Sequence, residues 1–236
     1  MKKILAFTLA ETLIVMGIIG IVSALTLPNL NSSTGEKEKV AKVKKIYRDL
    51  TDAYGRAQAV YGPMSDWFVN DSTGADRTKR FAERITEFMK VSKNCGNASG
   101  CWSTAPLLID MTDQDNNNYY QLLSSQKYYF VMLADGTCLA FSDFGTIRVD
   151  IDGPAKGKTQ AGNDIFDFKI DDDNTYLIPS YSPLNWTGNV TRDYLMYAYS
   201  TAWVIKNENL DYLKLDNSNK CPNGKQLNWE TQITCK

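Results

Sequence analysis

The 236-residue chain contains no histidine. This absence removes the commonest general base of enzymes, the Ser-His-Asp and Cys-His pairings, and every histidine-ligated metal site. The charges are nearly balanced, with 26 lysines and arginines against 27 aspartates and glutamates. Because nucleic-acid-binding proteins usually carry a basic excess, no nucleic-acid partner is expected. With no recognisable nucleophile or phosphate-binding loop either, the sequence does not indicate an enzyme.

Charged residues are scarce near the N-terminus, where residues 7–28 form an apolar run whose one charged side chain is Glu11. Two lysines precede this run. As a helix it would be roughly 32 Å long, about the thickness of the hydrocarbon core of a bilayer. An ionised carboxylate in hydrocarbon costs several kcal/mol unless it has a partner. We therefore interpret residues 7–28 as a membrane helix and Glu11 as a candidate functional residue.

Three interpretations of this run compete. A secretory signal peptide would be cut near residues 22–24, but it would discard Glu11. A plain membrane anchor would keep the two lysines in the cytoplasm and place the rest of the chain outside. That interpretation gives the topology and leaves Glu11 unexplained.

The third interpretation comes from a resemblance. The string AFTLAE at residues 6–11 resembles the prepilin-type signal of type IV pilins and type II secretion pseudopilins. The resemblance implies that a prepilin peptidase cuts between Ala6 and Phe7, which removes residues 1–6 as a leader. It also implies N-methylation of the new Phe7 amine and retention of Glu11 for assembly. The usual residue before the cut is glycine, and here it is Ala6.

The same resemblance implies a function and a location. The chain would be a structural subunit in the bacterial inner membrane, a single-pass protein with a short cytoplasmic N-terminus and a periplasmic head. It would assemble into a type IV pilus or a type II secretion pseudopilus, where Glu11 meets Phe7 of a neighbouring subunit. Its partners would be identical or related subunits, the prepilin peptidase, and an inner-membrane assembly platform with its ATPase. Pro28 corresponds to a proline that often kinks the helix of this family at the membrane exit.

Two other functions stay open. A minor pilin or tip adhesin would use the head as a surface-binding module, and the size of the head favours that role. An enzyme carried on a membrane anchor has less support, for the reasons given above.

The region after the apolar run has a helical pattern. Residues 29–62 carry apolar side chains at steps of three and four, which predicts the amphipathic half of one long helix, flexed or broken between Pro28 and Gly35. The stripe consists of Val40, Val43, Ile46, Tyr47, Leu50, Ala53, Tyr54, Ala57 and Tyr61. Such an apolar stripe must pack against another element, and we expect a sheet formed later in the chain to bury it.

The remaining residues, 63–236, are expected to form the head. Residues 76–92 predict a second, shorter helix. An Asp135-Gly136 turn between two β-favouring runs is a strong hairpin signal. The predicted antiparallel strands are residues 128–133, 137–141, 146–151 and 165–170. We therefore expect an α+β protein of the pilin-like kind, with the long helix packed on a small antiparallel sheet.

Five cysteines follow the apolar run, so at least one is unpaired or joins another chain. Cys95 and Cys101 bracket a short polar loop, which favours a local disulfide over a zinc site. Cys221 and Cys235 bracket the C-terminus, where type IV pilins often have a disulfide-closed loop. These pairings leave Cys138 as a free, buried thiol.

Residues 150–164 form an acidic, glycine-rich loop. Oxygen-rich side chains on such a loop suit Ca²⁺, and a nearby loop holds calcium in major pseudopilins. Asp152, Asn163 and Asp164 are the candidate ligands, and Ca²⁺ is the one cofactor that the sequence suggests. The alternative is a solvated turn, because the spacing matches no EF-hand and two lysines lie within the loop.

The last third of the chain is rich in aromatic residues between positions 181 and 203. Clustered aromatics can form a carbohydrate-binding or peptide-binding surface, but the packing of an extended C-terminal region is the favoured interpretation. Periodicity does not decide whether residues 194–205 form a helix or a strand. The aromatic residues are Tyr181, Trp186, Tyr194, Tyr197, Tyr199 and Trp203.

Overall fold

The structure is a computed structural model. It describes residues 9–68, 73–98, 100–102, 107–108, 128–142, 145–154, 159–171, 173–179 and 199–236. Within the helices and strands, the side chains of Glu11, residues 23–33, residues 107–108 and Thr159 lie outside this description. The chain divides into two compact units, Met1–Glu38 and Lys39–Lys236, which we call the stem unit and the head unit.

Helix α1 spans Leu9–Tyr61 and belongs to both units. Its backbone is helical from Leu9 through Pro28 to Tyr61. The kink at Pro28 stays a prediction. Over the residues that the structure describes, no helix combines the length and apolar character needed to cross a membrane.

The head unit contains a six-stranded antiparallel sheet in the order β1-β3-β4-β5-β7-β8. Strands β2 and β6 form a separate two-stranded parallel sheet. The strands are β1 Val91–Gly96, β2 Leu107–Leu108, β3 Tyr128–Leu133, β4 Cys138–Ser142, β5 Thr146–Asp150, β6 Thr159–Gln160, β7 Ile165–Ile170 and β8 Leu177–Pro179. The α+β class is confirmed, and so is the predicted hairpin, which pairs Tyr128 with Ser142 and Met132 with Cys138.

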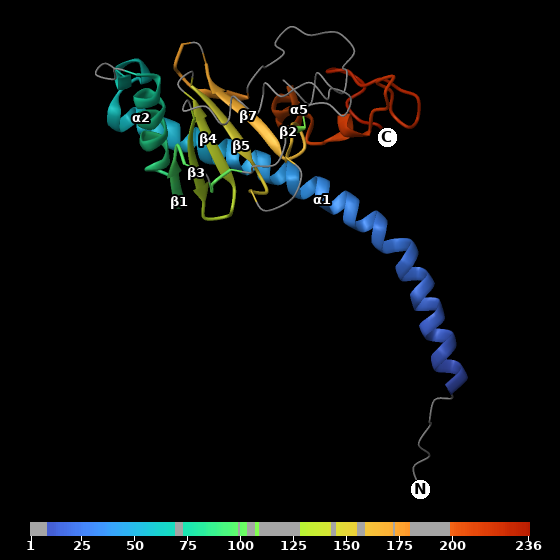
Figure 1. Cartoon of the computed structure of the whole chain (residues 1–236). Helices are drawn as coiled ribbons and strands as arrows, with labels where there is room; N and C mark the ends of the chain where they lie inside the picture. The colour runs from blue at the N-terminus through green and yellow to red at the C-terminus, as the bar shows by residue number, and fades with distance from the viewer. Residues whose placement is uncertain are drawn as a thin grey trace. The chain divides into compact units, whose positions relative to one another are not determined.

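One face of the sheet covers the apolar stripe of α1. Figure 1 shows the part of α1 within the head unit lying across the central strands. Val43, Leu50 and Ala57 are fully buried, and Tyr47 stacks on Phe168 of β7 with ring centroids 5.8 Å apart. Alternate residues of the strands supply the other side of this core, because side chains point to opposite faces along a strand. They include Val131, Leu133, Leu139, Phe141, Ile147, Val149, Phe166 and Phe168.

The second helix is shorter than expected. Helix α2 spans Gly74–Thr86. Thr73 is its N-cap, and the Thr73 side chain accepts a hydrogen bond from the Asp76 backbone N–H. Residues 91–96 are strand β1, so the helix predicted over residues 76–92 is wrong at its C-terminal end. The reason is long-range pairing: β1 bonds to β3, and Ser92 donates its hydroxyl to the Leu133 carbonyl at 2.9 Å. Tertiary pairing of this kind overrides local helix propensity.

The opposite face of the sheet has a smaller core and a buried ion pair. Phe130, Cys138 and Ala140 pack with Cys101 and Trp102. On the same face, Arg148 of β5 lies directly opposite Asp167 of β7 and holds it through two hydrogen bonds of 2.7 Å each. Bidentate pairs of this geometry fix the register of the two strands.

Both outer strands are irregular. Strand β1 shifts register between Val91 and Lys93 and again between Asn94 and Gly96. Strand β8 ends at Pro179, which pairs with Phe168 and lacks a backbone N–H.

The C-terminal region packs on its own aromatic residues. Helix α5 spans Ser200–Asn207, and the 3₁₀ helix η3 spans Asp211–Lys214. Trp203 is fully buried between Trp229 and Tyr212, with ring centroids 5.0 Å and 6.4 Å away. The packing interpretation is therefore confirmed for Trp203 and Tyr199. Tyr181, Trp186, Tyr194 and Tyr197 lie outside the described residues.

The core allows a test of the packing of α2 on the sheet. Phe141 in β4 is fully buried and meets the ring of Phe81 of α2 edge-on at 5.6 Å. We predict that Phe141→Ala lowers the free energy of unfolding by about 3–5 kcal/mol, because it leaves a cavity that the neighbours cannot fill. Val60→Ala is the matched control, since Val60 is 62% exposed, and it should change stability by less than about 0.5 kcal/mol. Urea titration measures both, and equal effects would contradict the assigned core.

Candidate functional site

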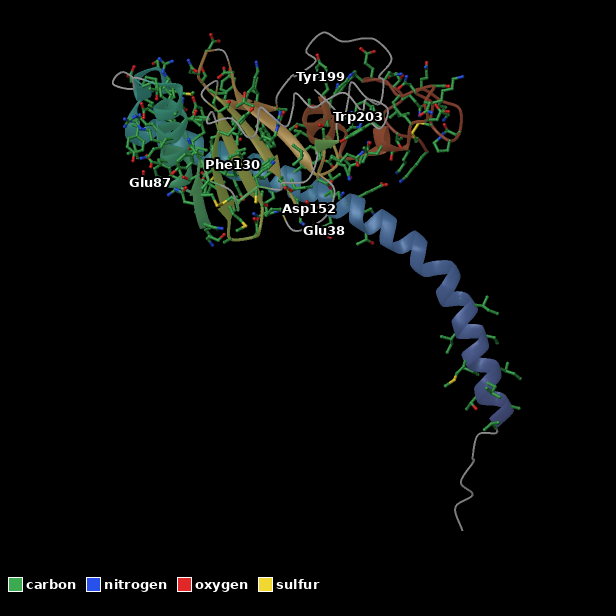
Figure 2. The ribbon with its side chains drawn as sticks, in the orientation of Figure 1. Glu38, Glu87, Phe130, Asp152, Tyr199 and Trp203 are labelled. Atoms are coloured by element: carbon green, nitrogen blue, oxygen red, sulfur yellow. A yellow bond between two sulfur atoms is a disulfide. The ribbon has the colours of Figure 1, made fainter. Side chains whose placement is uncertain are left out.

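The stem unit exposes a continuous apolar surface. From Leu9 to Val22 of α1, nine large apolar side chains are 53–80% exposed. Successive residues of a helix are rotated by about 100°, and several of these side chains are adjacent in sequence. The apolar surface therefore surrounds the helix, as the side chains drawn along it in Figure 2 also show. The nine residues are Leu9, Leu13, Ile14, Val15, Met16, Ile18, Ile19, Ile21 and Val22.

This surface is too large to be an ordinary feature of a soluble helix. Burying one side chain of this size is worth about 1.5–3 kcal/mol, so nine of them represent roughly 15–25 kcal/mol. A helix that packs on one neighbour is apolar along one stripe, whereas a helix that is apolar all round is buried on every side. Between Leu9 and Val22 the described side chains therefore expose apolar area on every side of the helix.

The other predicted sites of the N-terminus are only partly described. Ala6 and Phe7 lie outside the described residues. Glu11 and Pro28 lie in α1, with side chains outside the description. Their roles in cleavage, methylation, assembly and kinking stay predictions.

Both predicted disulfides are present in the head unit. Cys95 bonds to Cys101 and Cys221 bonds to Cys235, which closes the C-terminal segment. Cys138 is free and buried in β4, as expected. Burial, followed by the charges of Asp150 and Asp152, raises the pKa of its thiol to about 12, so Cys138 is unreactive at neutral pH.

Two residues of the acidic loop bind the positively charged side chain of Lys39 in α1. The Lys39 ammonium lies 2.7 Å from Asn163 Oδ1 and 2.8 Å from Asp164 Oδ1. Two of the three proposed calcium ligands are therefore already engaged. Among the residues that the structure describes, there is no group of three or more acidic or cysteine side chains arranged to hold a metal ion. Calcium binding stays an untested hypothesis.

The third proposed ligand, Asp152, lies elsewhere in the loop. Its backbone N–H and that of Gly153 donate to Oδ1 of Asp150, at 3.2 Å and 2.9 Å. Asp150 is almost completely buried. Gly153 has a φ of +79°, and a Cβ there would lie 2.5 Å from the carbonyl oxygen of Gly136, so only glycine allows this approach of the loop to the hairpin turn.

A cavity of about 370 Å³ opens between α1, the segment after α2 and the β3–β4 turn. Phe88, Met89 and Leu133 form its apolar part. At its rim Lys45 bonds to Asp49 at 2.9 Å and to Asp135 at 2.8 Å, so both carboxylates share one ammonium group.

Comparison with known proteins gives no match: no family model, no curated protein and no solved structure matches this chain.

Lys39 is the site residue that the sequence did not reveal. It lies in a run of charged residues on a predicted helix, where a solvated side chain is the ordinary expectation. Its partners are 124 and 125 residues further along the chain. No local pattern encodes a contact at that separation.

Asp150 gives the head a predicted dependence on pH. Burial, followed by the hydrogen bond with Asp152, raises its pKa to about 7. The pKa in the unfolded chain is about 4, so between these values the native state binds more protons and stability falls as the pH rises. Asp150→Asn keeps the Oδ1 acceptor and removes the charge. We predict that the variant matches the wild type near pH 4 and is more stable by on the order of 2 kcal/mol near pH 8.

Urea titrations at several pH values measure this difference. Asp173→Asn, at an exposed carboxylate, is the control and should leave the pH profile unchanged. If Asp150→Asn and the wild type lost stability in parallel above pH 4, Asp150 would not be the group that titrates.

Proposed function

We propose that the protein is a pilin-like structural subunit. It enters the bacterial inner membrane through residues 7–28, loses residues 1–6 to a prepilin peptidase, and assembles into a type IV pilus or a type II secretion pseudopilus. Assembly requires an inner-membrane platform and its ATPase. The role is structural rather than enzymatic, with other subunits as the main partners.

The observation that carries this proposal is the apolar surface of the stem. Nine large apolar side chains surround α1 between Leu9 and Val22, each at least 53% exposed. Lipid covers such a surface before assembly, and the helices of neighbouring subunits cover it afterwards. Both surroundings are apolar, so the exchange costs little, and this allows one segment to serve as anchor and as assembly interface.

The head supports the same role. Within the head unit, one apolar stripe of α1 from Val40 to Ala57 is buried under the sheet, so the same helix supplies both the exposed apolar side chains of the stem unit and part of the core of the head. Two disulfides and a large aromatic core suit a protein that works in an oxidising space outside the cytoplasm.

Glu11 sets the register in this proposal. In lipid its carboxylate has no permanent partner, whereas in the filament it meets the Phe7 ammonium of a neighbour, which offsets the cost of a buried charge. We predict that Glu11→Ala leaves processing and membrane insertion intact and reduces filament yield at least tenfold. Filaments sheared from the cells and quantified against the membrane-bound subunit measure the effect.

Two variants sharpen this experiment. Glu11→Gln removes the charge at nearly constant shape and should fail like Glu11→Ala. Asp52→Ala removes an exposed carboxylate from the same helix within the head unit and should assemble normally. Normal filament yield from Glu11→Gln would refute the charge-pair mechanism.

Leader removal is tested separately. N-terminal sequencing of the mature protein from its native host should start at an N-methylated Phe7. A mature protein that starts at Met1, or near Leu25, would instead indicate an anchor or an ordinary signal peptide. Ala6→Gly should be cut at least as efficiently as the wild type.

A minor subunit or tip adhesin is the second candidate. The C-terminal region beyond β8 favours it, because α5, η3 and their aromatic residues extend the core beyond the helix and sheet. Copy number separates the two roles: a major subunit dominates purified filaments, and a minor subunit is present in a few copies.

A further inference from the structure

Lys39, Asn163 and Asp164 form a group whose geometry goes beyond an ion pair. Lys39 lies on α1, and the other two residues lie in the turn between β6 and β7. The Lys39 Nζ donates to the amide oxygen of Asn163 at 2.7 Å. The carbonyl carbon is one bond of about 1.2 Å beyond this oxygen, so it lies within about 4 Å of the amine. Other lysine ion pairs of the head unit, such as those at Lys44 and Lys45, join ammonium groups to carboxylates alone.

Asp164 hydrogen-bonds both to the Lys39 amine and to the amide nitrogen of Asn163. Its Oδ1 accepts from Lys39 Nζ at 2.8 Å, and its Oδ2 accepts from Asn163 Nδ2 at 3.3 Å. One carboxylate is therefore within reach of the attacking amine and of the group that would leave. This is the arrangement that a general acid–base needs.

The turn holds these groups in place. The backbone N–H groups of Asn163 and Asp164 both donate to the Gln160 carbonyl, at 3.2 Å and 2.9 Å. The hydroxyl of the fully buried Tyr212 donates to the carbonyl of Gly162. Positioning of this kind converts an encounter into an intramolecular step, which is worth several orders of magnitude in rate.

The surroundings favour proton transfer to Asp164. Its side chain is 8% exposed, and that of Lys39 is 30% exposed. Burial raises the pKa of Asp164, although the hydrogen bond and charge of Lys39 act against this shift. A carboxylate in such a site accepts a proton more readily than one in water.

We propose that Lys39 and Asn163 condense to an intramolecular isopeptide bond, with Asp164 as the catalytic residue. Asp164 takes a proton from Lys39 Nζ, and the neutral amine attacks Cγ of Asn163. The new Nζ–Cγ bond forms while the Cγ–Nδ2 bond breaks. The two protons that Lys39 loses leave with Nδ2 as ammonium, and Asp164 returns to its starting state. No oxidant, cofactor or second protein is required.

The bond would join positions 124 residues apart, linking α1 to the sheet. A cross-link that closes so long a segment restricts the unfolded chain strongly. All three residues lie in the head unit, so the proposal does not depend on filament assembly.

Mass spectrometry of the purified, reduced full-length protein after tryptic digestion tests the bond. We expect the peptides that contain Lys39 and Asn163 to appear as one branched species, lighter than their sum by one ammonia. Trypsin should fail to cut after Lys39. Recovery of the two peptides separately, with cleavage after Lys39, would overturn the proposal.

Variants distinguish formation of the isopeptide bond from other reactions that release ammonia. Lys39→Arg keeps the positive charge but offers a guanidinium, which is a poor nucleophile, so the branched species should vanish. Cyclisation of Asn163 to a succinimide also releases ammonia, but it would persist in Lys39→Arg and leave no branched peptide. Asp164→Asn should reduce the branched fraction at least tenfold, and an unchanged fraction would exclude Asp164 as the catalytic residue.

Discussion

The head depends on the burial of one apolar stripe of α1 beneath one face of the sheet. Val43, Leu50 and Ala57 provide the helix side of this contact, and alternate residues of β3, β4, β5 and β7 provide the sheet side. Neither surface is stable in water alone, because each exposes large apolar area. The rest of the head is arranged around this contact: α2 closes one end of it through Phe81, and the aromatic residues of the C-terminal region extend it.

The apolar side chains of α1 are arranged differently in the head unit and in the stem unit. Within the head its apolar side chains occupy one stripe and its charged side chains face water, so a single cover satisfies it. In the stem the apolar side chains surround the helix, so no single cover is sufficient. This difference in sequence pattern, rather than any difference in secondary structure, distinguishes the part of α1 that packs on its own chain from the part whose large apolar side chains are exposed.

Much of the head could be predicted because its signals are local. The hairpin at Asp135-Gly136, the strands at residues 146–150 and 165–170, and the stripe of α1 all follow from short-range patterns. The short polar loop between Cys95 and Cys101 allowed the first disulfide to be expected, and the place of Cys221 and Cys235 around the C-terminal segment, together with the pilin resemblance, suggested the second. The errors came from long-range effects. Strand β1 replaced the end of a helix because β3 offered it hydrogen bonds, and β8, three residues long, has no pattern of its own. The contact of Lys39 with Asn163 and Asp164, two of the three proposed calcium ligands, joins residues 124 and 125 positions apart, and no local sequence pattern displays it.

The irregular outer strands limit how readily the sheet can pair with a strand of another molecule. The register shifts of β1 and the proline at the end of β8 leave both edges of the sheet poorly suited to accept another strand. Heads held close together at high local concentration would therefore resist fusing into a continuous, amyloid-like sheet.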